Sequence, residues 1–262
     1  MAKNLATQGV LPLPMPVQQA AAARGLGAFR KTYQATLART VAVIILFLLA
    51  AVGFSAGAIF GNDLNIGGRI IFLLLVLLFV VVSIYLIFSV IEAAQRQLYL
   101  FQLGLVIEKG NQIQVLPWRD LQVRQSITRR SSNGIYVGTT YSYTLRRSDG
   151  YHIELGSLVK NIAELGQAIT TGVTQELVPH AFSAIRAGQT LTFDPFSVNL
   201  QGIGFKREFL PWPQVQEVVA SRGSLTIKKA PPRSGSWLAL VSRVPNVMVF
   251  LVIAEEMRKQ AA

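Results

Sequence analysis

The chain has 262 residues, 51% of them hydrophobic, and its 25 Lys and Arg exceed its 13 Asp and Glu by a formal net charge of +12. It contains no cysteine, which excludes disulfide bonds, thiolate zinc sites and cysteine nucleophiles. The excess of positive charge favours an acidic partner, such as an anionic lipid surface or a nucleic acid.

Residues 1–40 form the first predicted segment. Pro12, Pro14 and Pro16 alternate with apolar residues, and this spacing predicts an extended, mobile arm because proline lacks the N–H that a helix interior needs. The stretch Val17–Arg39 is rich in alanine and predicts a juxtamembrane helix. This helix either lies on the membrane surface or extends the first membrane span into the cytoplasm.

Two long apolar runs follow, Val41–Phe60 and Ile70–Ile91, separated by a short polar stretch rich in glycine. A helix needs about 20 residues to cross about 30 Å of hydrocarbon, and it satisfies its own backbone there. We therefore predict a transmembrane α-hairpin over residues 41–92. The alternatives are a pair of helices buried in a soluble core and a cleaved signal peptide ending near Ala58. The forty residues before the first run argue against the signal peptide.

The basic residues predict the orientation of this hairpin. Arg24, Arg30, Lys31 and Arg39 precede the first run and Arg96 follows the second. Lys and Arg remain preferentially on the cytoplasmic side of a membrane. We expect a multi-pass protein of the inner (plasma) membrane, with both the N- and the C-terminus in the cytoplasm.

From residue 93 the pattern changes to short segments that are rich in Val, Ile and aromatic residues, with Gly, Asn and Asp turns between them. This pattern is typical of antiparallel strands. A helix opened by Asn161 as its N-cap follows five predicted strands: Leu103–Glu108, Gln112–Val115, Leu121–Ile127, Thr139–Leu145 and Tyr151–Leu155. Residues 93–187 are predicted to form one domain together with its connecting helix.

Residues 188–262 are predicted to repeat this order of strands followed by a helix. The motif Leu116-Pro117-Trp118 is echoed by Leu210-Pro211-Trp212, and the final helix is again opened by an asparagine, Asn246. The first copy is longer, which we assign to a longer loop around Arg129–Gly138. The order of elements predicts a duplication of two tandem PH-like barrels, each an antiparallel sheet closed by a C-terminal helix. The two tryptophans are expected to anchor the two cores. The fold class is thus a membrane α-hairpin plus α+β.

Seven segments of the two copies stand out: Asn133–Thr140, Tyr143–Gly150, Gly188–Thr190, Phe196–Val198, Gln201–Ile203, Leu210–Trp212 and Pro245–Leu251. These segments resemble a family of uncharacterised bacterial membrane proteins that is known only as a domain of unknown function. The resemblance implies a two-transmembrane protein with PH-like β-structure. It implies no activity and no functional residues.

The sequence shows no motif that is typical of a catalytic or metal-binding site. His152 and His180 lie in different predicted elements without ligand-like spacing, and no phosphate-binding loop is present. We therefore predict that the protein is not an enzyme, has no catalytic or metal-binding residues, and uses no cofactor.

A basic cluster in the first copy is the candidate ligand site. Arg124, Arg129, Arg130, Arg146 and Arg147 lie on two strands that are expected to pair. Guanidinium groups bind phosphate through paired hydrogen bonds, so this cluster suits an anionic lipid headgroup or another phosphate.

These observations predict a non-catalytic binding or scaffolding protein whose partners are membrane lipids and, in addition, a protein or peptide. The alternative is a membrane-tethered nucleic-acid-binding protein, favoured by the sequence pI of about 10.4. The absence of a repeated aromatic stacking platform counts against nucleic acid.

Overall fold

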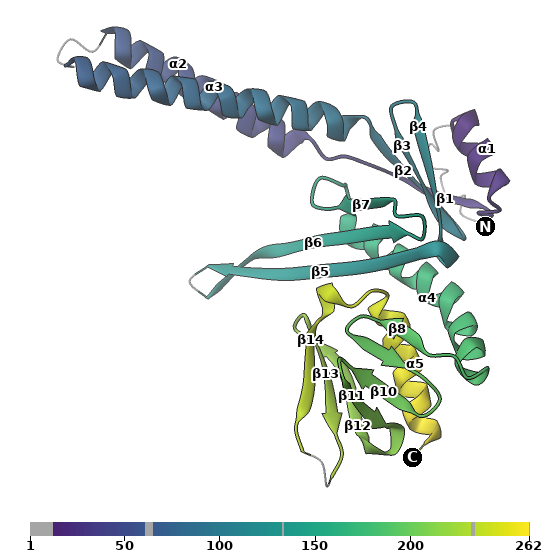
Figure 1. The fold of residues 1–262 in the computed structure, drawn as a ribbon. Coiled ribbons are helices and arrows are strands. Elements are labelled where there is room, and N and C mark those ends of the chain that lie inside the picture. Colours follow the sequence, from purple (N-terminus) through teal and green to yellow (C-terminus); the bar gives the residue numbers. More distant parts are fainter. Residues whose placement is uncertain (1–12, 61–64, 133, 232–233, 262) are drawn as a thin grey trace, which may run out of the picture. The chain divides into compact units, whose positions relative to one another are not determined.

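The computed structural model describes residues 13–60, 65–132, 134–231 and 234–261 (Figure 1). They divide into two compact units. One unit lies within Gln34–Gln97 and Glu108–Gln112 and contains two long helices. The other lies within Met1–Tyr33, Leu98–Ile107 and Ile113–Ala262 and contains most of the strands. The chain is therefore an α+β protein with a pair of apolar helices, as predicted.

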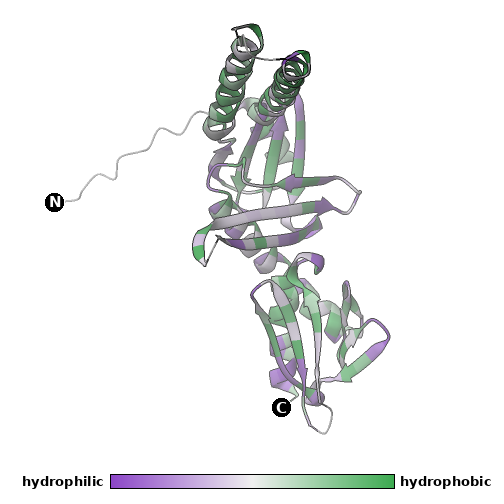
Figure 2. Ribbon diagram, turned by 90° about the vertical axis from the view of Figure 1, so that its left-hand side faces the viewer, coloured by the Kyte–Doolittle hydropathy of each residue, from purple (hydrophilic) through white to green (hydrophobic). Residues whose placement is uncertain are grey.

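The helical pair consists of α2 (Ala38–Phe60) and α3 (Ile66–Ala94). The two helices pack through aromatic rings, since the ring of Phe54 lies 5.6 Å from that of Phe72 and 5.5 Å from that of Phe79. Both helices are long and apolar enough to cross a membrane, yet only 17% and 6% of their most apolar windows are buried. Figure 2 colours both almost continuously as hydrophobic. Helices of a soluble core are buried, so this exposure argues against that alternative.

The segment before the helical pair differs from the prediction. Helix α1 (Met15–Ala23) has Pro16 in its first turn, where the missing N–H removes no helical hydrogen bond. Gly25 and Gly27 follow with φ values of 65° and 73°, which glycine adopts without strain, and they end the helix. Strand β1 (Phe29–Gln34) comes next. The prediction of one helix across Val17–Arg39 is therefore wrong, and part of the predicted mobile arm, residues 1–12, lies outside the described residues.

Helix α1 and strand β1 belong to the folded body. Val17 and Leu26 are buried in a cluster with Phe101, and the ring of Phe29 meets that of Phe101 edge to face at 5.7 Å. The strand order of the sheet is β1-β2-β3-β4. The chain thus leaves this sheet after β1, forms α2 and α3, and returns as β2 (Arg96–Phe101). The helical pair is inserted between two neighbouring strands of one sheet.

The first module comprises β1–β7 and α4. Its first sheet is completed by β3 (Gly104–Lys109) and β4 (Gln112–Pro117), and a 3-10 turn, η1 (Trp118–Asp120), leads to the second sheet. That sheet contains β5 (Leu121–Ser132), β6 (Ile135–Arg147) and β7 (His152–Leu155), paired antiparallel in this order. Helix α4 (Ile162–Arg186) ends the module. Strand β2 was not among the predicted strands, whereas β3 to β7 and α4 were.

The second module comprises β8–β14 and α5 and follows the same order. Its four-stranded sheet contains β8 (Leu191–Phe193), β9 (Phe196–Val198), β10 (Gly202–Phe205) and β11 (Glu208–Pro211). After η2 (Trp212–Gln214), the three-stranded sheet contains β12 (Val215–Ser221), β13 (Ser224–Lys229) and β14 (Ser236–Leu240). The turn η3 (Val241–Arg243) leads to α5 (Val247–Gln260).

Closed barrels are not found among the described residues, whose strands form four separate sheets. In each module the break falls at the Leu-Pro-Trp motif. Pro117 has no N–H to donate and Trp118 opens a 3-10 turn, so the chain changes direction between β4 and β5. Pro211 and Trp212 have the same effect before β12. The prediction of one closed sheet per module is corrected to two open sheets and a helix.

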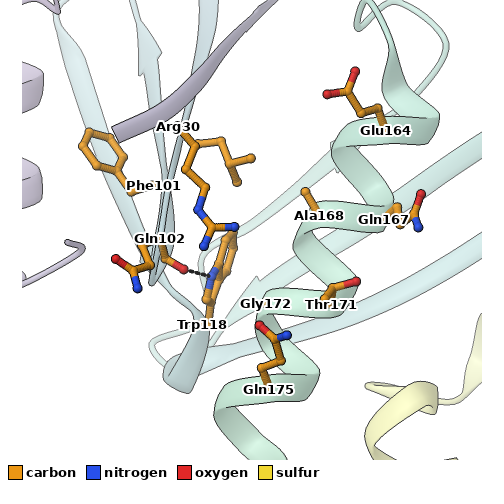
Figure 3. A pocket seen from close by; sticks show the side chains of 11 residues that line it. Arg30, Phe101, Gln102, Trp118, Glu164, Gln167, Ala168, Thr171, Gly172 and Gln175 are labelled. Atoms are coloured by element: carbon orange, nitrogen blue, oxygen red, sulfur yellow. Dashed lines mark hydrogen bonds between the residues drawn. The ribbon is translucent and has the colours of Figure 1, made fainter. Parts of the chain in front are cut away.

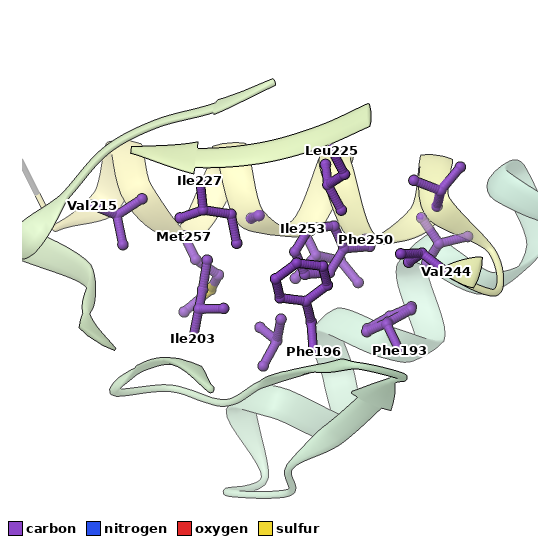
Figure 4. Close-up of a cluster of buried hydrophobic side chains, with 14 of the residues drawn as sticks. Phe193, Phe196, Ile203, Val215, Leu225, Ile227, Val244, Phe250, Ile253 and Met257 are labelled. Carbon is purple, nitrogen blue, oxygen red and sulfur yellow. The ribbon is translucent and has the colours of Figure 1, made fainter. Parts of the chain in front are cut away.

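The first core lies between the two sheets of its module and α4, and the second lies between the two sheets of its module, α5 and the C-terminal part of α4, which contributes Ala181 and Ile185. In the second module, Ile227 of β13 and Ile203 of β10 share the core with Ile253 of α5, and all three are fully buried (Figure 4). Trp118 and Trp212 are 2% and 3% exposed and belong to the first and the second core. Their predicted role as core anchors is confirmed.

The two tryptophans also make equivalent hydrogen bonds. Trp118 Nε1 donates to the backbone oxygen of Gln102 at 3.0 Å, and Trp212 Nε1 donates to that of Asn199 at 3.1 Å. Gln102 lies in the turn between β2 and β3, and Asn199 lies in the turn between β9 and β10. These are equivalent turns of the two four-stranded sheets. A buried indole N–H needs such a partner, so the same local solution appears in both modules.

The two helix-opening asparagines differ from their predicted role as side-chain caps. Asn161 and Asn246 both adopt the left-handed conformation, with φ of 57° and 48°, and neither side chain caps its helix. Asn246 instead joins the two modules: its Oδ1 accepts from Val123 N at 2.8 Å, and its Nδ2 donates to Leu121 O at 3.1 Å. Its backbone N–H also donates to Val123 O at 2.8 Å. These bonds cover part of the outer edge of β5, which would otherwise be open to other strands.

Candidate functional site

The β5–β6 hairpin carries all five predicted site arginines. The two strands pair in register from Leu121 opposite Arg147 as far as Arg130 opposite Gly138, and a bulge follows. Strand β7 pairs only with Tyr143–Arg146, so beyond this point the hairpin is a two-stranded ribbon, visible in Figure 1. The expected longer loop of the first copy is therefore mostly regular paired strand.

The pleat of these strands divides the arginines between two faces. Residues directly opposite one another share a face and successive residues alternate. Arg147 lies opposite the buried Leu121, so it shares the core side of the hairpin with Arg129. Arg124, Arg130 and Arg146 lie on the outer side. The five residues therefore do not form one cluster.

On the outer side only two of the arginines are neighbours. Arg146 lies opposite Gln122, and Arg124 lies opposite Thr144, so the two arginines are diagonal neighbours about 7–8 Å apart. Arg130 is six residues further along β5, about 20 Å away. Glu154 lies opposite Thr144 on β7 and accepts a hydrogen bond of 2.7 Å from Ser142. The outer patch near β7 therefore contains one carboxylate beside its two arginines.

Arg147 is bound within the module. Its Nη2 lies 2.6 Å from Asp149 Oδ2, and its Nη1 donates to Val115 O at 2.7 Å. The guanidinium lies 5.3 Å from the centre of the Tyr151 ring. Hydrogen bonds from Arg147 and from the Tyr151 N–H lower the pKa of Asp149 to about 2. Arg147 thus links the β6–β7 turn to β4 and has a structural role.

The end of the hairpin is apolar. Ile135, Tyr136 and Val137 are 72%, 64% and 65% exposed. Ile135 pairs with Ser132 and Tyr136 with Ser131, and the small Ser131 side chain leaves the Tyr136 ring uncovered. Sequence reasoning did not select these three residues, although an Ile-Tyr-Val run beside Gly134, at the end of a polar strand, marks an exposed apolar tip.

A pocket of about 270 Å³ lies between α4 and the first sheet (Figure 3). Gln167, Thr171 and Gln175 of α4 line one side, and Gln102 and Trp118 lie opposite them. The i, i+4, i+8 spacing of the three α4 residues was a signal that sequence reasoning missed. The volume is slightly below that of typical small-molecule sites, which begin at about 300 Å³.

The ion pair beside this pocket fastens β1 to α4. Lys31 Nζ lies 2.6 Å from Glu164 Oε1, and the Tyr33 hydroxyl donates to the same oxygen at 3.1 Å. Burial, together with the hydrogen bond to Glu164, raises the pKa of Tyr33 to about 12. The hydrogen bond from Lys31 lowers the pKa of Glu164. These groups are satisfied by one another, so this contact has a structural role.

No metal centre emerges from the described residues, among which no group of three or more His, Asp or Glu side chains could hold a metal ion. His180 lies on the exposed side of α4, 4.0 Å from Glu176 of the same helix. The predicted absence of catalytic residues, metal and cofactor stays a prediction.

Comparison with known proteins gives a family but no characterised relative. No curated protein and no solved structure matches the chain. The model of a family of unknown function, DUF6585, matches residues 6–262. The match spans the helical pair and both modules, and the chain therefore belongs to DUF6585.

Proposed function

We propose that this chain is a non-catalytic, membrane-anchored binding or scaffolding protein. In this proposal α2 and α3 span the inner (plasma) membrane of a bacterial cell, both termini are cytoplasmic, and two PH-like modules work at the inner leaflet. The ligand of the first module is an anionic group, such as a phosphate-bearing lipid headgroup, bound by the outer arginines of the β5–β6 hairpin. A protein or peptide partner of the tandem modules is compatible with this arrangement.

One observation carries the anchoring. The helical pair is inserted between β1 and β2, which are neighbours in one sheet. Two strands can pair only on the same side of a membrane, so β1 and β2 lie on one side. The chain must therefore enter the membrane from that side and return to it. This requires an even number of crossings, which two helices of spanning length supply. The excess of basic residues before α2 and after α3 then favours the cytoplasmic side.

The PH-like assignment is supported by the order of elements. A four-stranded sheet, a three-stranded sheet and a C-terminal helix follow one another in both modules, which is the layout of a PH-like domain with two open sheets. Duplication is supported by the equivalent bonds of Trp118 and Trp212 and by the left-handed Asn161 and Asn246 before the two helices.

The ligand class follows from charge. Residues 121–147 contain five arginines and no Asp or Glu. Of these, Arg124 and Arg146 lie close enough on one face to contact the same phosphate group. Guanidinium–phosphate bonds are directional and charge-assisted, which suits a lipid headgroup at the membrane surface.

The first test determines the topology of the full chain. A reporter that is active only outside the cytoplasm is fused at Ala262 or inserted in the segment between α2 and α3. We expect activity from the insertion and none from the fusion at Ala262. Activity at Ala262 would overturn the orientation.

The second test measures lipid preference of the detergent-solubilised full chain by native mass spectrometry. Phosphatidylglycerol and phosphatidylcholine are titrated in parallel, and we expect more adducts with the anionic lipid. Combining Arg124→Ala with Arg146→Ala should remove this preference. The matched control is Arg222→Asn, which removes one exposed charge from the corresponding hairpin of the second module and keeps a residue that tolerates φ of 50°. Equal loss in both variants would contradict a specific site. Preferential binding of added DNA oligonucleotides would favour the nucleic-acid alternative.

A further inference from the structure

The tip of the β5–β6 hairpin is apolar on both of its faces. Ile135 pairs with Ser132 and Tyr136 with Ser131, so the Ile135 and Tyr136 side chains lie on opposite sides of the ribbon. Val137 is the unpaired residue of the bulge that follows Tyr136. All three are largely exposed. A strand that docks on a protein surface needs one apolar face, whereas a tip with two apolar faces suits an environment that surrounds it. A lipid leaflet is such an environment.

A basic band lies directly behind the tip. Arg129 and Arg130 are adjacent, so their side chains leave opposite faces of β5, and they lie opposite Thr139 and Gly138. No acidic residue interrupts the hairpin between Leu121 and Arg147. The hairpin thus combines an apolar tip with guanidinium groups on both faces behind it. This combination is complementary to an anionic membrane, because the apolar interior accommodates the tip and the headgroups bind the arginines.

The second module provides an internal comparison. Its corresponding hairpin, β12–β13, has strands of 7 and 6 residues, against 12 and 13 for β5–β6. Its turn at Arg222 and Gly223 carries no apolar residue. The extra length of the first hairpin is where Arg129, Arg130 and the three apolar residues lie. The combination of exposed apolar and basic residues at the end of a hairpin therefore occurs in the first module and not at the turn of the second.

We propose that the tip Ile135–Val137 inserts into the anionic leaflet that anchors the protein, with Arg129 and Arg130 at the headgroup level. Ile135 is paired with Ser132, two residues beyond Arg130 on β5, which places it about 7 Å further along the ribbon than Arg130. Interfacial amphipathic segments are buried to about 5–10 Å, so the ribbon is long enough to reach below the headgroups. Tyr136 has an aromatic ring and a hydroxyl, the combination that is favoured at this level.

The inference rests on the proposed anchoring by α2 and α3, because the anchor supplies the leaflet. Only Gln95 separates α3 from β2, and three residues separate β1 from α2. Connections this short hold the first module at the membrane surface, so insertion of the tip is an intramolecular event with a high effective concentration of lipid.

The absence of cysteine allows a direct test on the full chain. Ile135→Cys is labelled with an environment-sensitive fluorophore, and the protein is reconstituted in nanodiscs of phosphatidylcholine with or without phosphatidylglycerol. Ser221→Cys, an exposed position at the turn of the second hairpin, is the matched control. We expect the label at residue 135 to show blue-shifted emission, quenching by nitroxides on lipid tails and protection from aqueous iodide. The label at residue 221 should remain accessible to iodide.

Charge variants test the basic band. Each basic residue near an anionic surface contributes about 1 kcal/mol, so Arg129→Gln combined with Arg130→Gln should weaken insertion about 30-fold, which corresponds to about 2 kcal/mol. Arg222→Asn should leave insertion unchanged. Because all the substituted side chains are exposed, circular dichroism of all variants should match that of the wild type.

The outcomes separate this inference from the anchoring. A label at residue 135 that stays accessible to iodide in every nanodisc, in a protein whose reporter fusions confirm two spans, overturns insertion and leaves the anchor intact. Protection that appears only with added nucleic acid, or only when the protein self-associates, also overturns it. Lipid quenching that requires phosphatidylglycerol and is lost in the double arginine variant supports it.

Discussion

Removal of the Asn246 side chain tests how the two modules are joined. The side chain makes two hydrogen bonds to β5, with the N–H of Val123 and the C=O of Leu121. Asn246→Gly deletes both bonds and keeps a residue that adopts φ of 48° without strain. Each bond contributes about 0.5–1.5 kcal/mol, so the free energy of unfolding should fall by about 1–3 kcal/mol.

The matched control is Asn161→Gly. Asn161 has the same left-handed conformation before α4 and makes no side-chain cap bond. The greater flexibility of glycine in the unfolded chain affects both variants alike, so the difference between them isolates the two bonds of Asn246. Asn246→Ala should be worse than Asn246→Gly, because an alanine in this conformation is strained by about 1–2 kcal/mol.

The assay is denaturant unfolding of the full chain in detergent, followed by tryptophan fluorescence. All three tryptophans lie in the modules and none in α2 or α3, so the signal reports the modules alone. Hydrogen exchange at the Val123 amide gives a local measurement, and its protection should fall in Asn246→Gly and persist in Asn161→Gly. Equal destabilisation by the two glycine variants, with Val123 still protected, would refute the reasoning.

Three further predictions concern the first module. Trp118→Ala should lower the free energy of unfolding by about 3–5 kcal/mol, because a buried indole and its hydrogen bond are lost; a wild-type denaturation curve would contradict its core role. A fragment that starts at Gln95 lacks β1 and should aggregate or melt early in light scattering and circular dichroism. A soluble chain in which a short Gly/Ser linker joins Phe29–Gln34 to this fragment should fold, and equal behaviour of the two would contradict the role of β1. Asp149 titrates near pH 2 in the folded protein and near its ordinary value of 3.8 when unfolded, so its stabilising contribution is full above about pH 4 and is lost as the pH falls to about 2. Asp149→Asn should therefore be less stable than the wild type at neutral pH and equal to it near pH 2, as measured by denaturation across pH.

Strong local patterns made much of the fold predictable. The two apolar runs predicted α2 and α3 because about 20 uninterrupted apolar residues have few alternatives to a membrane helix. The alternation of apolar and polar residues predicted most strands of the first module, whereas the break into two sheets at the Leu-Pro-Trp motif was not predicted. Strands β8, β9 and β10 were missed, since segments of three or four residues are too short to show a periodic pattern.

The candidate site was predictable in composition and only partly in arrangement. The sequence shows five arginines near one another, but whether they share a face depends on register. Pairing of Leu121 with Arg147 and of Arg124 with Thr144 separates them, and the partners of Arg147 lie on β4 and in the β6–β7 turn. Register depends on long-range pairing and on the bulge after Arg130, which no local pattern specifies.

The sequence by itself determined the helical pair, the α+β class, the basic hairpin and the two core tryptophans, because each depends on composition or on spacing within a short window. Only the tertiary structure decided that β1, which precedes the helical pair, pairs with β2, which follows it. It likewise decided that Asn246 binds β5 rather than capping its own helix. Both are contacts between segments far apart in the chain, and their free energy comes from hydrogen bonds that exist only after the modules have folded.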